Sequence, residues 1–466
     1  MNLKKEVKSR SLYLLRFPLL VSLGLASLMP KGFSSTELVN DETIKFQKDS
    51  TFELKLDNQV PVTYRQIPGS EIFLIMVAFD FGESFLRSSE RPQLGVLTEL
   101  MERGSTSYPK DNLFALLEKY ATGINCGMGI EQGSCSLSTL NPYVDELLPA
   151  FASQLIEPSF DPLETKLVLE QAQAAEAASL QNPESYVNEV VNGIFYGEKH
   201  PYWAPQARKL EALSKIKLDD LKALHQRLLH KTAKRIVVVG SMPPDDLKKL
   251  LNKHFALFQT APQVALKVPR PTYSPSKNFR FAARDIPTSY VRAKFVMPGI
   301  DSPDLIASQL MIHILSEELE NEVRTKRSLS YSVYAQVIPY SMGIGVLHAS
   351  TSKPKETLEV IKPIIEKLKG QKLSQAELAR YKTVFATSYF LNLEEHSSLA
   401  VSMANSMSYF KTTDRLYEMP RMLAAITPDD IQKAAQKYLK QFRLGVVFKE
   451  KGFDTKWAQD FLKSFP

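Results

Sequence analysis

The sequence is poor in the side chains that most often bind a metal. It has two cysteines and seven histidines among 466 residues, and the first histidine is His200. A structural zinc site needs four ligands, mostly cysteine and histidine. No histidine lies near either cysteine, and the histidines show no paired ligand spacing. A cysteine-based zinc site is therefore excluded.

Beyond its N-terminus the sequence also has little excess charge. The formal net charge is +7, and residues 1–35 contribute a local +5 because their six cations are opposed by Glu6 alone. The remaining residues carry +2, the difference between the two. The six cations are Lys4, Lys5, Lys8, Arg10, Arg16 and Lys31. We therefore see little reason to expect a nucleic-acid partner.

The N-terminal segment has the form of a secretory signal peptide. Its cations precede an apolar block, Phe17–Leu28, that is too short for a comfortable membrane span. Small residues at 24–26 and at 32–34 both suit cleavage. We expect residues 1–35 to direct export to the periplasm, with no membrane association after the leader is removed. A mitochondrial presequence, which is usually amphipathic, is the alternative.

The two cysteines flank an expected hairpin turn. Cys126 and Cys135 lie on either side of Ile130 and Glu131, so they could face each other across two strands. Export would permit a disulfide, whereas two buried free thiols are the other interpretation.

The length and a long-range repeat predict two domains. Residues 155–164 and 368–377 share a helix end followed by a helix-capping pattern, at a constant offset of 213. An apolar strand followed by a helix opens each half, at residues 72–81 and 290–297. The proline-rich segment 261–280 reads as a linker. We predict an α+β fold with domains at 36–260 and 281–466.

One stretch of the second domain combines three cations with a tyrosine that opens a strand. A helical pattern from about Pro303 runs into Arg324, Lys326 and Arg327, and a strand pattern opens at Tyr331. Cations are favoured at the C-terminal end of a helix, which accounts for Lys326 and Arg327. The return from helix to strand would bring Arg324 towards Tyr331, and both side chains are donors to a carbonyl oxygen.

Together these patterns resemble the pitrilysin/insulinase-type (inverzincin) zinc metallopeptidases, in their short two-domain bacterial form. The resemblance covers nearly all of the chain after the leader, and it rests on the order and spacing of motifs that are weak singly. They are residues 95–106, 195–202, 237–240, 324–331 and 426–431. It implies two duplicated α/β-sandwich domains that face each other across a cleft.

The resemblance also implies that the zinc motif is lost. Active members carry His-x-x-Glu-His, in which the histidines bind zinc and the glutamate activates water. Aligned on Gly104, the histidine positions fall on Gly95 and Glu99 and the base on Thr98. Glu176 stands about where the third ligand belongs, but one carboxylate does not hold catalytic zinc. We expect no metal in this chain and a structural role for His200.

The family's other functional pair is retained. Arg324 and Tyr331 match an arginine and a tyrosine that hold a substrate carbonyl, where a donor pair stabilises developing negative charge. Ser328 and Ser330 depart from the family pattern, and Ser328 makes a left-handed helix end less comfortable.

These matches imply a non-catalytic, substrate-binding subunit, inactive alone, of a heterodimeric zinc peptidase. A homologous partner would carry the zinc, and the substrate would be a peptide. The alternative is a scaffold with no role in proteolysis.

Overall fold

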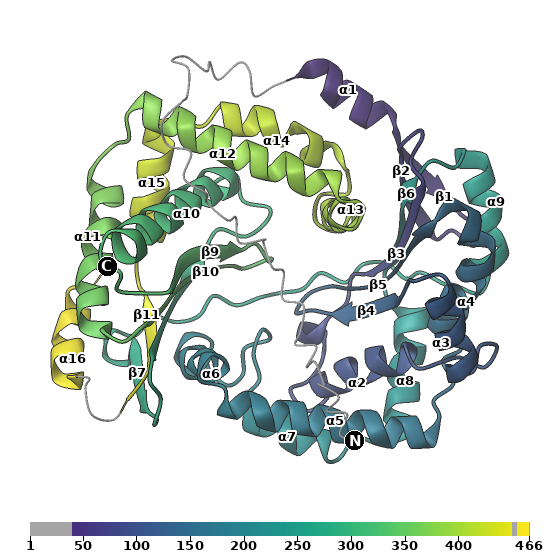
Figure 1. Cartoon of the computed structure of the whole chain (residues 1–466), viewed down its shortest axis with the longest axis horizontal. Coiled ribbons are helices and arrows are strands. Elements are labelled where there is room, and N and C mark those ends of the chain that lie inside the picture. Colours follow the sequence, from purple (N-terminus) through teal and green to yellow (C-terminus); the bar gives the residue numbers. More distant parts are fainter. Residues whose placement is uncertain (1–39, 450–453, 466) are drawn as a thin grey trace, which may run out of the picture.

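The computed structural model describes residues 40–449 and 454–465. The expected signal peptide lies outside these residues. Two β-sheets stand on opposite sides of the molecule, and most helices cover their outer faces (Figure 1). The predicted α+β fold of two like domains is confirmed. Among the described residues, no helix is both long and apolar enough to span a bilayer.

The first half forms a six-stranded sheet in the order β1-β2-β6-β3-β5-β4. Its strands are β1 (Thr51–Lys55), β2 (Pro61–Gln66), β3 (Ile72–Phe79), β4 (Ile124–Met128), β5 (Gly133–Leu140) and β6 (Lys234–Gly240). Its helices are α1 (Asp41–Asp49), α2 (Arg91–Met101), α3 (Lys110–Lys119), α4 (Val144–Ile156), α5 (Pro162–Gln181), α6 (Pro183–Phe195), α7 (Gln206–Leu213), α8 (Leu218–Lys231) and α9 (Pro244–Phe255), with short turns η2 (Glu83–Phe85) and η3 (Asn141–Tyr143).

The second half forms a five-stranded sheet in the order β7-β11-β8-β10-β9. Its strands are β7 (Phe279–Ala283), β8 (Ser289–Met297), β9 (Ser332–Ile338), β10 (Gly343–Thr351) and β11 (Arg443–Phe448). Its helices are α10 (Leu305–Leu319), α11 (Pro354–Gly370), α12 (Gln375–Glu394), α13 (His396–Phe410), α14 (Asp414–Ala424), α15 (Pro428–Tyr438) and α16 (Thr455–Lys463), with η4 (Pro275–Lys277) and the π-helical turn η5 (Glu320–Thr325).

The repeat read from the sequence extends over two consecutive helices. α12 begins and ends 213 residues after α5, and α13 begins 213 residues after α6. The capping box of Ser374 with Glu377 is present at the start of α12. Its expected counterpart is only half formed, because Asp161 caps α5 whereas Glu164 binds Lys110 instead.

The two halves exchange helices. α6, from the first half, packs on β11 and β8 of the second sheet, and α13, from the second half, packs on β6 and β3 of the first. Both helices lie between the sheets in Figure 1. β3 is therefore apolar on both faces, as its sequence predicts: Phe73 and Ile75 point into the outer core, and Leu74 and Met76 meet α13.

The two exchanged helices sit on chemically different surfaces. Beneath α13 the contact is apolar, with Met76 and Val237 against Leu399 and Met403. Beneath α6 it also contains buried polar and charged groups. β8 contributes Arg292 and Lys294, β10 contributes His348 and β11 contributes Arg443, and all four side chains are buried. Gly445 of β11 lets α6 approach closely, because a Cβ there would lie 3.1 Å from Val191.

A buried carboxylate ties the halves together at a third place. Glu131, at the β4–β5 turn, accepts hydrogen bonds from the hydroxyls of Tyr202 and Tyr409, the latter at 2.5 Å. It also accepts from the backbone N–H of Ser341 in the β9–β10 hairpin, at 3.1 Å. These donors come from both halves, and they replace the hydration that a buried carboxylate loses.

Candidate functional site

The degenerate zinc-motif positions lie on one helix but cannot bind a metal. Gly95 and Glu99 are exposed on α2, one turn apart. Thr98, at the base position, is buried and donates to the carbonyl oxygen of Gly95 at 3.0 Å. Glu99 pairs with Arg103 at 2.6 Å. In place of a metal ligand, position 99 therefore contributes an ordinary ion pair near the end of α2.

Glu176 does not restore a site. It lies on α5, which packs against α2, and burial raises the pKa of its carboxyl while nearby Lys209 opposes that effect. No group of three or more histidine, cysteine or acidic residues in the described ranges is placed to hold a metal. With no imidazole beside Glu99, the donor set does not fit catalytic zinc.

His200 has a structural environment. Its Nε2 bonds the carbonyl oxygen of Pro269 at 2.8 Å, and its Nδ1 accepts from the backbone N–H of Tyr202 at 3.1 Å. Both ring nitrogens are thereby used, and burial lowers the pKa of the imidazole.

Arg324 and Tyr331 are brought together at the surface. The guanidinium carbon of Arg324 lies 5.6 Å from the centre of the Tyr331 ring, within cation–π range. Arg324 Nη1 donates to Glu320 at 2.9 Å, and its other donors have no hydrogen-bond partner among residues 40–449 and 454–465. The Tyr331 side chain is 86% exposed, so the fold gains little from burying it.

The turn between them is irregular and well anchored. α10 ends in the π-helical turn η5, which carries Arg324, and Ser328 follows with a left-handed φ of 50°. Ser330 is buried, and its hydroxyl bonds the carbonyl oxygens of Ser332 and Ser350 at 2.8 and 2.7 Å. A π-helical turn costs regular hydrogen bonding and is found frequently at functional sites.

The neighbouring cations have local partners. Lys326 and Arg327 both pair with Glu322, at 2.6 and 2.5 Å. This agrees with their interpretation as ordinary helix-end cations. Sequence reasoning overlooked Glu320 as the partner that orients Arg324, although its spacing of four residues is a signal for such a pair.

The pair lies away from the Glu131 junction between the halves. Tyr331 directly precedes β9, and Ile338 ends that strand close to the hairpin whose Ser341 binds Glu131. At about 3.3 Å per residue, roughly 23 Å of strand separates the two ends. The Arg324–Tyr331 pair is therefore at the opposite end of β9 from the Glu131 junction.

The cysteines are joined in a disulfide. Cys126 of β4 and Cys135 of β5 are directly opposite in the register of the hairpin, with their Cα atoms 4.0 Å apart. The bond fixes the edge strand of the first sheet to its neighbour.

Comparison with known proteins agrees with this geometry. Residues 215–385 match the family profile described as "Peptidase M16 inactive domain". The "Non-peptidase homolog YmxG" of Helicobacter pylori is 25% identical over 357 residues, covering 73% of this chain and 80% of that protein. The chain is a homologue of the M16 peptidases. The family resemblance inferred from the sequence is thereby confirmed.

A second sequence relative and a solved structure are also similar to this M16 homologue. The "Zinc protease PqqE" of Helicobacter pylori is 22% identical over 263 residues, covering 53% of this chain and 58% of that protein. The crystal structure of a peptidase M16 inactive domain from Pseudomonas fluorescens superimposes with a TM-score of 0.77 at 19% identity, covering 87% of this chain and 99% of that one.

Proposed function

We propose that this M16 homologue is the substrate-binding subunit of an exported, heterodimeric zinc peptidase that degrades peptides or unfolded segments. The observation that carries the proposal is the contrast between two sites. The zinc-motif positions hold Gly95 and Glu99, whereas Arg324 and Tyr331 remain paired and exposed. A surface pair that contributes little to folding is expected to serve binding.

The chemistry assigned to the pair is carbonyl stabilisation. Arg324 has guanidinium donors that Glu320 does not use, and Tyr331, whose ring centre lies 5.6 Å from the Arg324 guanidinium carbon, offers its phenol hydroxyl as a second donor. A peptide carbonyl oxygen between them would gain two hydrogen bonds, which strengthen as the oxygen becomes negative during hydrolysis. The partner subunit would supply the zinc and the attacking water.

Two further observations support the assembly. Helicobacter pylori contains both a relative named a non-peptidase homologue and a relative named a zinc protease. The Tyr331 side chain is also 86% exposed, so another chain can reach it. The Cys126–Cys135 disulfide agrees with an oxidising compartment such as the periplasm.

The test is reconstitution with a zinc-bearing M16 subunit. Zinc content and peptide cleavage are measured for each chain alone and for the two together, and cleavage is expected only where the partner is present. In the complex, Arg324→Ala should lower kcat/KM by about ten- to a thousandfold, the range for one transition-state donor.

Arg327→Ala is the matched control, because Arg327 belongs to the same helix end but is paired with Glu322. Stoichiometric zinc or cleavage with this chain alone would contradict the proposal. If Arg324→Ala leaves kcat/KM unchanged in the complex, the scaffold interpretation replaces it. Three buried junctions between the halves suit a scaffold equally well.

A further inference from the structure

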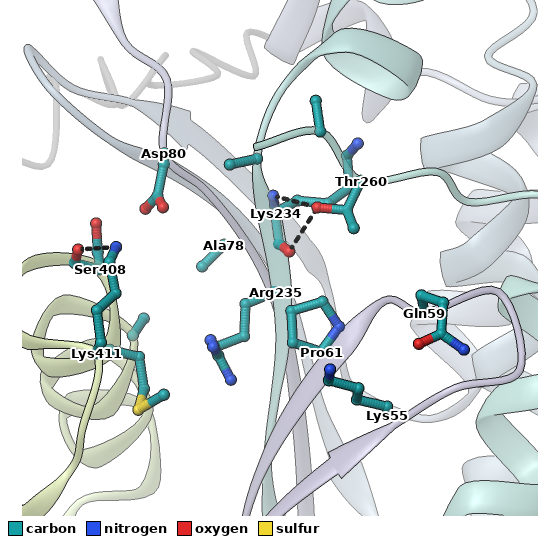
Figure 2. A pocket seen from close by; sticks show the side chains of 14 residues that line it. Lys55, Gln59, Pro61, Ala78, Asp80, Lys234, Arg235, Thr260, Ser408 and Lys411 are labelled. Carbon is teal, nitrogen blue, oxygen red and sulfur yellow. Dashed lines mark hydrogen bonds between the residues drawn. The ribbon is translucent and has the colours of Figure 1, made fainter. Parts of the chain in front are cut away.

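A hollow of about 280 Å³ opens between the first sheet and the C-terminal end of α13 (Figure 2). Its lining comes from both halves: β1, β2, β3 and β6 from the first, and α13 from the second. The volume lies just below the roughly 300–1,000 Å³ of pockets that enclose a whole small molecule. It suits a side chain or a chain end.

The floor of the hollow is a single row across four strands. Lys55 pairs with Pro61, and Arg235 pairs with Ala78. In the parallel pair of β2 and β6, Val62 is the register partner of Ile236. Pro61 and Arg235, one residue earlier on each strand, are therefore neighbours as well. The row therefore runs Lys55, Pro61, Arg235, Ala78. The side chains of Lys55 and Arg235 stand on either side of Pro61 in Figure 2.

This row makes a shallow cradle with a cation on each side. Two strand spacings separate the backbones of Lys55 and Arg235, about 10 Å, and the small Pro61 lies between them. A group that rests on Pro61 is within reach of both long side chains. Ala78 keeps the neighbouring position open as well.

Most other polar groups around the hollow already have partners. The Lys234 ammonium donates to the carbonyl oxygens of Leu229, Thr232 and Gln259. Lys411 donates to Gln263 and to the carbonyl oxygen of Ser408. The carboxyl of Asp80 is half-buried; its burial raises its pKa, and Ser408, Lys411 and Arg235 oppose that rise.

The two cations of the row have spare donors. Within the described residues, the Lys55 side chain makes no hydrogen bond or ion pair and is exposed. Arg235 uses one nitrogen, Nη1, which bonds Glu53 at 2.7 Å and Thr63 at 2.8 Å. Its Nη2 and Nε are left for a ligand. An ammonium and a guanidinium together bind a carboxylate through charge-assisted hydrogen bonds.

We propose that the hollow over Pro61 binds a peptide carboxylate through Lys55 and Arg235. The carboxylate is either the C-terminus of the peptide or an acidic side chain. This inference rests on the proposed function, since it treats the ligand as peptide, and it assigns a second contact remote from the Arg324–Tyr331 pair.

The test uses three short peptides and the purified full chain. The probes are acetyl-tetra-alanine with a free C-terminus, the same peptide amidated, and amidated acetyl-Ala-Glu-Ala-Ala. Titration calorimetry should show that at least one carboxylate-bearing peptide binds about tenfold more tightly than amidated tetra-alanine. The free-acid and glutamate peptides distinguish the two sources of the carboxylate.

Lys55→Gln should abolish this preference. The variant is expected to fold normally because the side chain is exposed and has no partner in the part of the chain that the structure describes. Arg235→Gln should act in the same direction, with circular dichroism to check that loss of the Glu53 bond has not disturbed the sheet. Lys222→Gln, which removes an exposed cation on α8, is the control and should retain the preference.

The inference would be overturned if neither carboxylate-bearing peptide bound more tightly than amidated tetra-alanine, or if the preference survived Lys55→Gln. Absence of binding by all three peptides would also overturn it. The proposed function would stand in each case, because it is judged by Arg324→Ala and cleavage in the complex.

Discussion

The ammonium of Lys294 donates to the side-chain oxygen of Asn192 at 2.6 Å, across the contact between the second sheet and α6. No carboxylate accompanies this bond. Arg292 stands two residues away on the same strand face, where it bonds Glu184, Tyr334 and His348. Burial, with a contribution from Arg292, lowers the pKa of Lys294 to about 7 and that of His348 to about 3.

These shifts predict that acid weakens the fold. The unfolded chain binds a proton at Lys294 below pH 10.5, whereas the folded chain does so only below about 7. Stability should therefore fall as the pH drops from about 10.5 to 7 through Lys294, and from 6.5 to about 3 through His348. Below about pH 7, Lys294 contributes no further change.

Lys294→Met isolates the first effect. The variant should be less sensitive to pH, with its free energy of unfolding changing by about 1–3 kcal/mol less than wild type between pH 9.5 and 7. Urea unfolding at both pH values measures this difference. Lys222→Met should follow the wild-type slope. A Lys294→Met variant with an unchanged slope would show that Lys294 is charged in the folded protein.

Ser328 offers a test of backbone strain beside the functional pair. Its φ of 50° is in the left-handed region, which costs an L-residue roughly 1–2 kcal/mol. Ser328→Gly should leave stability unchanged or raise it by up to about 1 kcal/mol, because the relief of strain is partly offset by glycine's greater unfolded-state entropy. Ser328→Val should destabilise by about 1–2 kcal/mol. Thermal unfolding distinguishes these outcomes, and equal midpoints for glycine and valine would rule out strain.

The disulfide should stabilise the first half moderately. Cys126 and Cys135 close a loop with a sequence separation of 9, for which the chain-entropy model gives about 2–3 kcal/mol. Reductant should lower the urea midpoint of the wild type. The Cys126→Ala, Cys135→Ala double variant should unfold at a lower midpoint that reductant does not change. If the urea midpoint of the wild type does not change after complete reduction, this expectation is contradicted.

Glu131 provides a test of the junction between the halves. Glu131→Gln places an amide against groups that all donate, so it should destabilise by about 1–3 kcal/mol. Tyr409→Phe removes one donor and should cost less. If the two residues act through their hydrogen bond, the double variant should lose less than the two single losses combined. Additive losses would show that the bond is not formed in solution.

The sequence predicted what depends on local pattern. Apolar strand patterns identified β3 and β8, the Ser374–Glu377 signal located the start of α12, and the offset of 213 predicted the duplication. The backbone strain at Ser328 was also predictable, because glycine is the usual residue at a left-handed helix end.

Features that depend on long-range packing could not be predicted. The exchange of α6 and α13 brings together segments with no local signal for each other. The row over Pro61 exists because the registers of three separate strand pairs coincide, and residues 55 and 235 are far apart in sequence. The π-helical turn that presents Arg324 also has no signal in the local sequence pattern.

The exchange of helices also sets an order of events during synthesis. All six strands of the first sheet have been made once residue 240 is added, but α13, which covers one face of β3 and β6, ends at Phe410. Because synthesis adds about 5–20 residues per second, that face would stay uncovered for roughly 10–30 seconds before α13 is complete. Neither half is then an independent folding unit, and a chain truncated before α13 should depend on chaperones to remain soluble.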